Sequence, residues 1–274
     1  MTITLKSNIK LNNGIEIPYI GLGTYQLRGN IAHKSVNTAL EAGYRLIDTA
    51  ESYYNEKDVG EAIKNSRIPR NEIFVTTKLA NENHGYDNTL KAFEGSLKRL
   101  GLDYIDLYLI HWPSSRLRNE TWKAFESILQ NGTCRSIGVS NYTVRHLKEL
   151  LSSSSTIPAV NQVEFNPYIY QKEILDLCRG KNIQLEGYTP LARTKKFNES
   201  ILKNISEKYG KSKAQILIRW SLQQNVITIP KSSNEYRIKE NINVFDFEIS
   251  DDDMDKLNSL DENLRFSPDP HNLE

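Results

Sequence analysis

Short apolar segments alternate along this chain with longer segments of helical period. Eight of the apolar segments end in polar or glycine-flanked residues: IGLGT, RLIDTA, IFVTTK, DLYLIHW, RSIGVSN, AVNQVE, QLEGYTP and VITIPKS. Between several of them, apolar residues recur at the spacing of an amphipathic helix, most clearly over 33–42, 89–100, 121–130, 144–151, 173–179 and 212–224. Repeated strand-then-helix order predicts a parallel sheet, and eight strands close such a sheet into a barrel.

Three segments fall outside this alternation. Residues 9–18, IKLNNGIEIP, predict a hairpin that plugs the N-terminal mouth of the barrel, because Asn13 and Gly14 supply the positive φ angles of a tight turn. Residues 199–209 predict an additional helix. Residues 250–260 predict a closing helix, with Ser250 and the acidic residues after it suited to its first turn. The tail FSPDPHNLE predicts an irregular coil over the surface or the mouth of a site.

The expected architecture is therefore an α/β fold. It is a (β/α)8 TIM barrel with an N-terminal β-hairpin plug and an extra C-terminal helix, and residues 1–274 are expected to form a single domain because no linker or repeat divides them. Net charge is +1, so no large single-sign field indicates a nucleic-acid or membrane partner. The chain has neither a signal-peptide pattern nor a transmembrane run, and we expect a cytoplasmic monomer.

Metal and disulfide chemistry have little support in the sequence. The two cysteines, Cys134 and Cys178, lie far apart and outside any CxxC spacing, which is typical of reduced structural thiols. The five histidines include no HExxH pattern, so no metal site is expected.

Four residues whose side chains could act together in one reaction lie at or just after the ends of consecutive predicted strands. Asp48 ends the segment RLIDTA and Tyr53 lies in the loop after it, while Lys78 and His111 end the next two segments. The C-terminal ends of barrel strands converge on one site, so these residues should meet there. Each alone has an ordinary structural interpretation as a cap, rim or core residue.

Together, the four residues predict proton delivery to an alkoxide formed by hydride attack. A phenol has a pKa near 10 and needs a neighbour that stabilises its phenolate. The ammonium of Lys78 would do so, and the carboxylate of Asp48 would keep that ammonium charged and aimed. His111 would donate a hydrogen bond to a carbonyl oxygen as negative charge develops on it.

Three windows of the sequence carry a specific resemblance. GYRLIDTAESYYNEKDVG (43–60), RSIGVSNY (135–142) and IPKSSNEYRIKENINV (229–244) resemble, in order and spacing, the signatures of the aldo-keto reductase family. The resemblance runs from about residue 9 to the C-terminal tail. It implies the same barrel, with Tyr53 as the general acid, Lys78 and Asp48 as its tuning pair, and His111 orienting the substrate carbonyl.

Hydride chemistry requires a nicotinamide or flavin, although no GxGxxG opens a βαβ unit in this chain. Lys231 follows the last strand and Arg237 lies near the start of the next helix, which favours a phosphate site. The resemblance implies NADPH or NADP+, preferred over NADH, with this segment holding the 2′-phosphate. The cofactor residues it implies are Thr24, Tyr25, Asp48, Ser140, Asn141, Gln162, Tyr188, Thr189, Leu191, Lys231, Ser232, Ser233, Arg237, Glu240 and Asn241.

The substrate is less well defined by the sequence. Tyr25 and Trp112, beside His111, match pocket-lining positions and predict an apolar wall next to a reactive carbonyl. The loops SSRLRNE and LARTKKF are short, so the expected mouth is open, as in the microbial members that reduce diketo-sugars, methylglyoxal and assorted aldehydes. Four basic residues near this mouth favour anionic carbonyl compounds or serve only solubility: Arg116, Arg118, Lys195 and Lys196.

The leading prediction is an NADPH-dependent reductase that converts aldehydes or ketones to alcohols, with a small-molecule carbonyl substrate. One alternative is an NADP(H)-binding sensor or structural protein on the same barrel with little turnover. Another is a sugar-phosphate isomerase or aldolase with Lys78 as a Schiff-base residue, which Asp48 disfavours because a paired carboxylate keeps the lysine charged.

Overall fold

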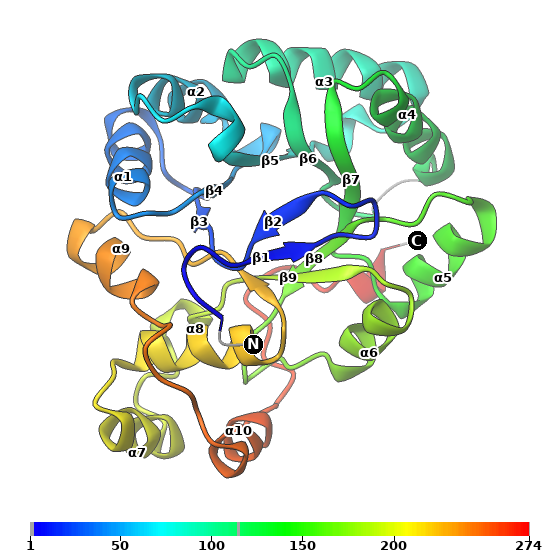
Figure 1. Ribbon diagram of the computed structural model, residues 1–274. Helices are drawn as coiled ribbons and strands as arrows, with labels where there is room; N and C mark the ends of the chain where they lie inside the picture. Colours follow the sequence, from blue (N-terminus) through cyan, green and yellow to red (C-terminus); the bar gives the residue numbers. More distant parts are fainter. Residues whose placement is uncertain (1–2, 114–115, 274) are drawn as a thin grey trace.

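Eight parallel strands form the inner layer of the molecule, and helices surround them (Figure 1). The computed structural model describes residues 3–113 and 116–273. In chain order, the strands are β3 (Leu22–Gly23), β4 (Leu46–Asp48), β5 (Phe74–Leu79), β6 (Ile105–Ile110), β7 (Cys134–Ser140), β8 (Val160–Glu164), β9 (Gln184–Tyr188) and β10 (Ile227–Thr228). Each strand pairs in parallel with the next one along the chain. The ring closes where Ile20, just before β3, bridges Thr228 of β10. The predicted (β/α)8 barrel is confirmed.

Helices follow the strands, and most of them lie where the periodicity predicts them. They are α1 (Gly29–Glu41), α2 (Glu56–Asn65), α3 (Tyr86–Leu100), α4 (Arg118–Gln130), α5 (Val144–Ser153), α6 (Lys172–Gly180), α7 (Ser200–Tyr209), α8 (Lys213–Gln223), α9 (Glu235–Ile242) and α10 (Asp251–Asn258). The additional helix α7 and the closing helix α10 are both confirmed. Helices α1, α3 and α4 begin about one turn earlier than predicted, and no range was predicted for α2 or α9.

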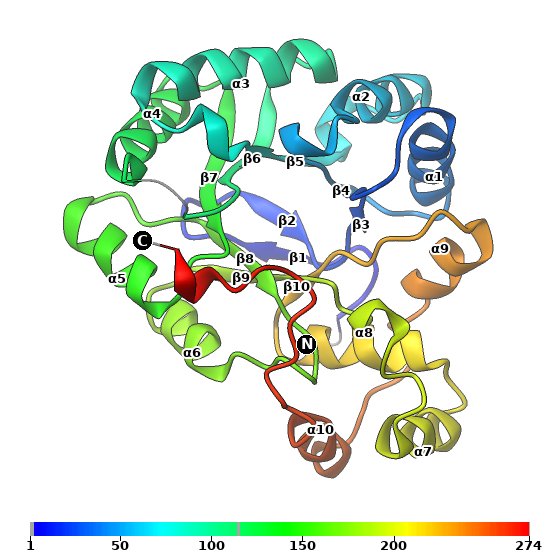
Figure 2. The ribbon, with the colours of Figure 1, turned by 180° about the vertical axis from the view of Figure 1, so that it is seen from behind.

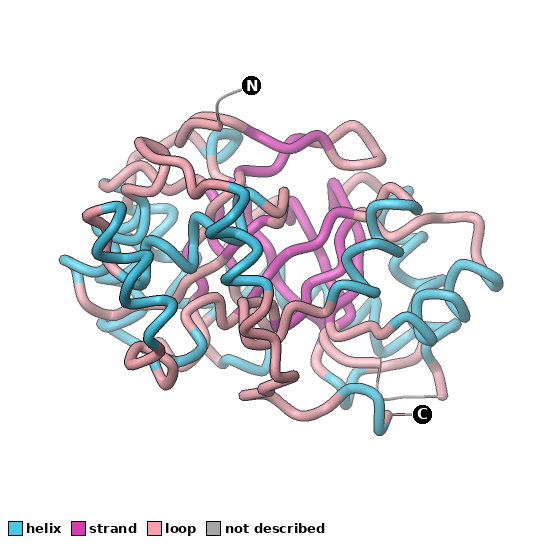
Figure 3. Tube along the Cα trace, turned by 90° about the horizontal axis from the view of Figure 1, so that it is seen from below, coloured by secondary structure: helices cyan, strands magenta, loops and turns pink. Residues whose placement is uncertain are grey.

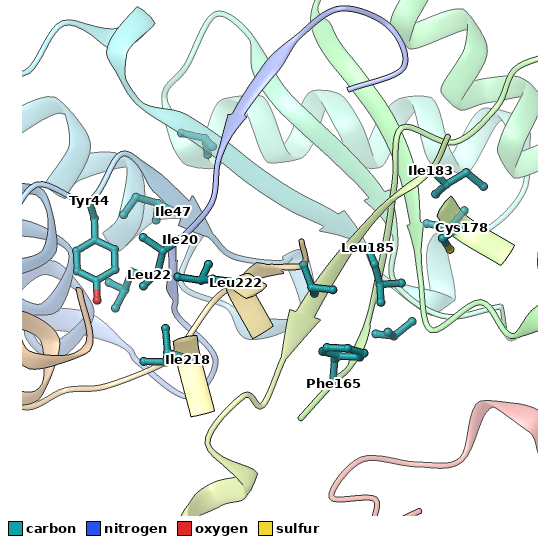
Figure 4. Packing of buried hydrophobic residues seen from close by; sticks show 14 of the residues in the cluster. Ile20, Leu22, Tyr44, Ile47, Phe165, Cys178, Ile183, Leu185, Ile218 and Leu222 are labelled. Carbon is teal, nitrogen blue, oxygen red and sulfur yellow. The ribbon is translucent and has the colours of Figure 1, made fainter. Parts of the chain in front are cut away.

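Apolar side chains of neighbouring positions in several strands belong to two different hydrophobic clusters. Leu46, Phe74 and Leu107 belong to a cluster inside the barrel, while their immediate neighbours Ile47 and Val75 belong to a larger outer cluster. This is the two-residue alternation of a closed sheet, with one face turned to the lumen and the other to the helices. Figure 4 shows part of the outer cluster, where strand residues meet side chains of α6 and α8.

A hairpin closes the N-terminal mouth of the barrel. Its strands β1 (Asn8–Lys10) and β2 (Glu16–Pro18) pair antiparallel. Ile9, Leu11 and Ile17 are buried and join the cluster inside the barrel, as expected of a plug. Figure 3 shows the hairpin at one end of the strands and the C-terminal segment at the other.

The hairpin turn differs from its prediction. Only Gly14 has a positive φ, of 86°, whereas Asn13 does not. The N–H of Gly14 donates to the carbonyl of Leu11 (2.9 Å), and the N–H of Leu11 donates to the carbonyl of Ile15 (2.8 Å). This longer loop needs a left-handed residue only at its last turn position, so the two-residue turn was the wrong turn type.

The C-terminal tail crosses the mouth opposite the hairpin, as Figure 2 shows in red. Its backbone N–H groups at Phe266 (2.9 Å) and Ser267 (3.2 Å) donate to the carboxylate of Glu164, which ends β8. The tail is irregular as predicted, apart from one 3₁₀ turn at Pro270–Asn272. Within the described parts of the chain, no helix is both long and apolar enough to cross a lipid bilayer.

Candidate active site

A pocket with a volume of about 940 Å³ opens at the C-terminal ends of the strands. Most of the predicted site residues line it: Tyr25, Asp48, Tyr53, His111, Trp112, Ser140, Asn141, Gln162, Tyr188, Thr189, Leu191 and Lys231. A second cavity of about 170 Å³ lies beside the hairpin at the opposite face, away from these groups. The large pocket is therefore the candidate active site.

Asp48 and Lys78 form a buried ion pair at the base of this pocket. The ammonium Nζ of Lys78 lies 2.7 Å and 2.8 Å from the two carboxylate oxygens of Asp48 and donates to the carbonyl of Thr49 (2.8 Å). Both side chains are almost completely buried. Burial raises the pKa of Asp48, while the charge and hydrogen bonds of Lys78 and a hydrogen bond from Gln162 oppose that rise. An ammonium held by three acceptors is a poor nucleophile, and this geometry opposes the Schiff-base alternative.

Tyr53 lies above the ion pair. It ends the 3₁₀ turn η1 (Glu51–Tyr53), and its hydroxyl Oη is 3.5 Å from Nζ of Lys78. Glu51 anchors this turn, because its carboxylate accepts bonds from the N–H of Ala80 (3.0 Å) and the amide of Asn83 (3.0 Å). Tyr53 is thus held by a link between the loops that follow β4 and β5.

The ammonium does not lower the pKa of Tyr53 as the sequence argument expected. Burial raises the pKa of this phenol well above its usual value, and the carboxylate of Asp48 adds to the rise. The charge of Lys78 is paired with that of Asp48 at contact distance, so it does not offset the effect of burial on the pKa of this phenol. Tyr53 is accordingly a protonated phenol at neutral pH, which is the form that donates a proton.

His111 faces the same space from the end of β6. Burial, followed by the charge of Lys78, lowers the pKa of its imidazole to about 3, so the ring is neutral at physiological pH. Its Nδ1 lies 3.2 Å from the hydroxyl of Ser52, the residue before Tyr53. If that hydroxyl donates to Nδ1, the proton of the ring resides on Nε2, which has no partner among the described residues.

Polar groups at the ends of β7, β8 and β9 are linked by hydrogen bonds on the opposite wall of the pocket. The amide nitrogen of Asn141 donates to the carbonyl of His111 (2.9 Å), and its oxygen accepts from the hydroxyl of Tyr188 (2.7 Å). The hydroxyl of Ser140 donates to the main-chain carbonyl of Gln162 (2.9 Å). Asn141 has a φ of 63°, so the chain turns sharply where β7 delivers this amide.

The predicted nucleotide-binding residues do not all line the pocket. Lys231 does, but Ser232, Ser233, Arg237, Glu240 and Asn241 lie beyond it, on the segment that leads into α9 and on that helix. Asn234 caps α9 by accepting from the N–H of Arg237 (3.1 Å), and the Arg237 side chain is exposed. Thr24 is buried, with its hydroxyl donating to the carbonyl of Asp48 (2.8 Å).

Several pocket residues escaped the sequence argument. They include Gln26, Ser52, Asn81, Arg193 and the tail residues Phe266, Ser267, Pro268 and Leu273. Arg193 sits in a turn where Ala192 (46°), Arg193 (48°) and Thr194 (61°) all have positive φ angles, which no sequence rule predicts for these residue types. The basic composition of the loop LARTKKF was the one available signal for Arg193.

Two of the basic residues predicted near the mouth form ion pairs with acidic residues. Arg118 forms an ion pair with Glu149 (2.8 Å), and Lys196 pairs with Glu262. The loop SSRLRNE is short, as predicted, since only 111–117 separate β6 from α4; its residues 114 and 115 lie outside the described part of the chain.

Comparison with known proteins identifies the family. Residues 19–262 match the model of the aldo/keto reductase family. The chain is 50% identical over its whole length to a glyoxal reductase of Bacillus subtilis, covering 99% of that protein. It is 43% identical to a morphine 6-dehydrogenase of Pseudomonas putida, over 97% of this chain and 95% of the relative.

Solved structures agree with the sequence relatives. An aldo-keto reductase from a Medee basin deep-sea metagenome library matches with a TM-score of 0.95 and 45% identity, over 97% of this chain and 99% of that one. A Bombyx mori aldo-keto reductase in complex with NADP matches with a TM-score of 0.90 and 37% identity, over 96% of this chain and 95% of that one. The chain belongs to the aldo/keto reductase family and is an oxidoreductase that acts on carbonyl groups.

Proposed function

We propose that this protein is an NADPH-dependent reductase that converts aldehydes or ketones to alcohols, with Tyr53 as the general acid. The observation that carries the proposal is the convergence of a protonated phenol, a buried ammonium and a neutral imidazole on one pocket. A proton donor beside a hydrogen-bond donor is what a carbonyl oxygen needs while it becomes an alcohol. The NADP-bound Bombyx mori relative supports the choice of cofactor.

The polar wall of the pocket fits a nicotinamide. Its carboxamide carries both N–H donors and a carbonyl acceptor, and Ser140, Asn141 and Gln162 offer groups of both kinds. The side-chain carbonyl oxygen Oε1 of Gln162 accepts no hydrogen bond from the described residues and is thus available to such a donor. Bound NADPH would supply the hydride. Tyr188 and Leu191 would pack against the flat ring from the same wall, while Lys231 and Arg193 offer charge for phosphates.

Each of the four catalytic side chains has a separate role in the proposed reaction. Nε2 of His111 donates a hydrogen bond to the substrate carbonyl and orients it. Tyr53 gives its proton to that oxygen, and Lys78 stabilises the phenolate that is left. The carboxylate of Asp48 holds the ammonium in place throughout. The tail and Trp112 restrict the entry of water to the pocket.

We further propose that small aldehydes and dicarbonyl compounds are substrates. The Bacillus subtilis relative is named a glyoxal reductase, and it is 50% identical to this chain. Tyr25, Trp112 and Phe266 give the pocket an apolar wall beside the polar one. Initial rates of NADPH oxidation with a series of aldehydes, dicarbonyls and keto-sugars test the assignment, and absence of turnover with the whole series would contradict it.

We expect Arg237→Ala to weaken binding of NADPH by roughly 10- to 150-fold, because losing one charged hydrogen bond costs about 1.5–3 kcal/mol. NADH lacks the 2′-phosphate, so its dissociation constant should barely change. Both constants are measured by quenching of protein fluorescence. Lys239→Ala, an exposed cation two residues further along α9, is the matched control. Equal losses for the two cofactors would contradict the assignment.

We expect Ser52→Ala to lower kcat/KM roughly 2- to 12-fold, the range for one neutral hydrogen bond. Without the Ser52 hydroxyl, the neutral ring of His111 is no longer held in the form that carries its proton on Nε2. Ser52→Thr retains a hydroxyl and should recover most of the loss. Initial-rate kinetics with one aldehyde decide the matter: an alanine variant as active as the wild type would exclude this role for Ser52.

A further inference from the structure

Glu186 carries a buried carboxyl group to which the proposed mechanism assigns no role. It lies in the middle of β9, on the face turned to the barrel lumen, and its relative exposure is 0%. Burying a carboxyl group is costly unless its oxygens find partners. Its position beside the Asp48–Lys78 pair therefore calls for an explanation.

Glu186 shares one hydrogen-bond donor with Asp48. The side-chain nitrogen Nε2 of Gln162 donates to Oε1 of Glu186 (2.7 Å) and to Oδ2 of Asp48 (2.8 Å). Both oxygens of Asp48 already accept from the ammonium of Lys78, so Asp48 is a carboxylate and can only accept. The Gln162 atom between the two acids must therefore be the NH2 group, and the orientation of this amide is fixed without ambiguity.

The pairing of two strands fixes the positions of Gln162 and Glu186. Gln162 and Glu186 are direct partners in the parallel pairing of β8 with β9. Both N–H bonds of the Gln162 amide are committed, one to each acid. Its carbonyl oxygen is left for the pocket, which Gln162 lines. Because the three side chains project from rigid strands, the orientation of the amide does not depend on a mobile loop.

The charge state of Glu186 agrees with this arrangement. Its second oxygen, Oε2, has no hydrogen-bond partner within the described residues, so an ionised carboxylate would be poorly solvated there. The charged groups that face it are the Asp48 carboxylate on β4 and the Lys78 ammonium on β5. Burial, and then the Asp48 carboxylate, raises the pKa of Glu186, while Lys78 and Gln162 oppose the rise. A neutral Glu186 accepts from Gln162 without adding a second negative charge beneath Tyr53.

We propose that Glu186 is a positioning residue that clamps the Gln162 amide with its carbonyl oxygen turned into the pocket, where that oxygen accepts an N–H of the nicotinamide carboxamide. The proposal rests on the proposed function, in that it requires a nicotinamide cofactor. Without the acceptor on Glu186, one N–H of Gln162 loses its partner and the amide is free to turn. The enzyme then loses its ability to distinguish a carboxamide from a group that has no N–H.

Two cofactors that differ only in this group provide the test. NADP+ carries the carboxamide, whereas its 3-acetylpyridine analogue carries an acetyl group with no N–H donor. We expect the wild type to bind NADP+ more tightly than the analogue, by titration calorimetry. In Glu186→Leu the ratio of the two dissociation constants should fall roughly 2- to 12-fold, the effect of one neutral hydrogen bond. Glu186→Gln keeps an acceptor oxygen and should preserve the ratio.

A background variant separates the clamp from a general structural role. Gln162→Ala should already remove the preference for NADP+ over the analogue. Adding Glu186→Leu to that variant should not change the ratio of the two dissociation constants further. The proposed role of Glu186 is refuted if Glu186→Leu weakens binding of both ligands equally. It is also refuted if Glu186→Gln lowers the ratio of the dissociation constants as much as Glu186→Leu does. Glu186→Met offers a second apolar variant should the leucine disturb folding. Failure of the wild type to bind either dinucleotide would instead refute the proposed cofactor, and the clamp with it.

Discussion

Replacing Tyr53 by phenylalanine is expected to reduce kcat by roughly 100- to 10,000-fold, the range attributed to a positioned general acid. The substitution removes one hydroxyl and keeps the ring, so contacts with Tyr25 and His111 at 5.1 Å and 5.6 Å between ring centroids should persist. Binding of NADPH should therefore change little. Steady-state rates of aldehyde reduction, with the dissociation constant of NADPH measured alongside, check both parts of this prediction.

The neighbouring residue provides a control for Tyr53. Tyr54 is 74% exposed, and its hydroxyl is not part of the pocket, so Tyr54→Phe should retain wild-type rates. A Tyr53→Phe variant with more than about a tenth of wild-type kcat would contradict its role as the acid. A wild type that binds NADPH and reduces nothing would favour the sensor or structural alternative instead.

Removing the ammonium of Lys78 should lower both activity and stability. Lys78→Met leaves the carboxylate of Asp48 buried without its counter-charge, and breaking a buried pair in this way costs about 3–5 kcal/mol. The free energy of unfolding, from urea denaturation, should fall by that amount. Catalysis should fall with it, because no cation is left to stabilise the phenolate of Tyr53. Combining Lys78→Met with Asp48→Asn should recover much of the stability but not the activity.

A surface lysine provides the control for Lys78. Lys57 pairs loosely with Glu61 at 3.8 Å, with the Lys57 side chain 78% exposed. Exposed pairs contribute about 0–1 kcal/mol, so Lys57→Met should be close to neutral. If Lys78→Met destabilises the protein no more than Lys57→Met does, the carboxylate of Asp48 is not dependent on its partner, and the account of the buried pair is wrong.

The raised pKa of Tyr53 agrees with the proposed role of this residue as a proton donor. The sequence argument expected Lys78 to lower the pKa of the phenol, whereas burial raises it. A protonated phenol is ready to donate to an alkoxide, but oxidation of an alcohol would first require a phenolate as the base. Burial and the charge of Lys78 also lower the pKa of His111 to about 3, which agrees with its proposed role as a hydrogen-bond donor and not as a second acid.

Strand ends explain why much of the candidate site could be predicted. Asp48, Lys78, Gln162 and Tyr188 all lie at or near the C-terminal ends of short apolar segments, and parallel strands in a barrel bring those ends together. Segment order was enough to place them around one pocket. The residues that a sequence argument could not find depend on contacts across the barrel. Nothing in the segment QLEGYTP distinguishes Glu186 from a solvent-exposed acid; only its register with Gln162 shows the shared donor.

The sequence by itself determined the alternation of strands and helices, the hairpin at the N-terminus, and the order in which chemically useful side chains reach the barrel mouth. These features follow from local periodicity and from the rule that parallel strands share one direction. The tertiary structure alone decided that the pKa values of Tyr53 and Glu186 are raised, that Ser52 is the partner of His111, and that the tail crosses the mouth of the pocket, where Glu164 holds it. Burial and contact distance govern those properties, and neither is encoded by neighbours along the chain.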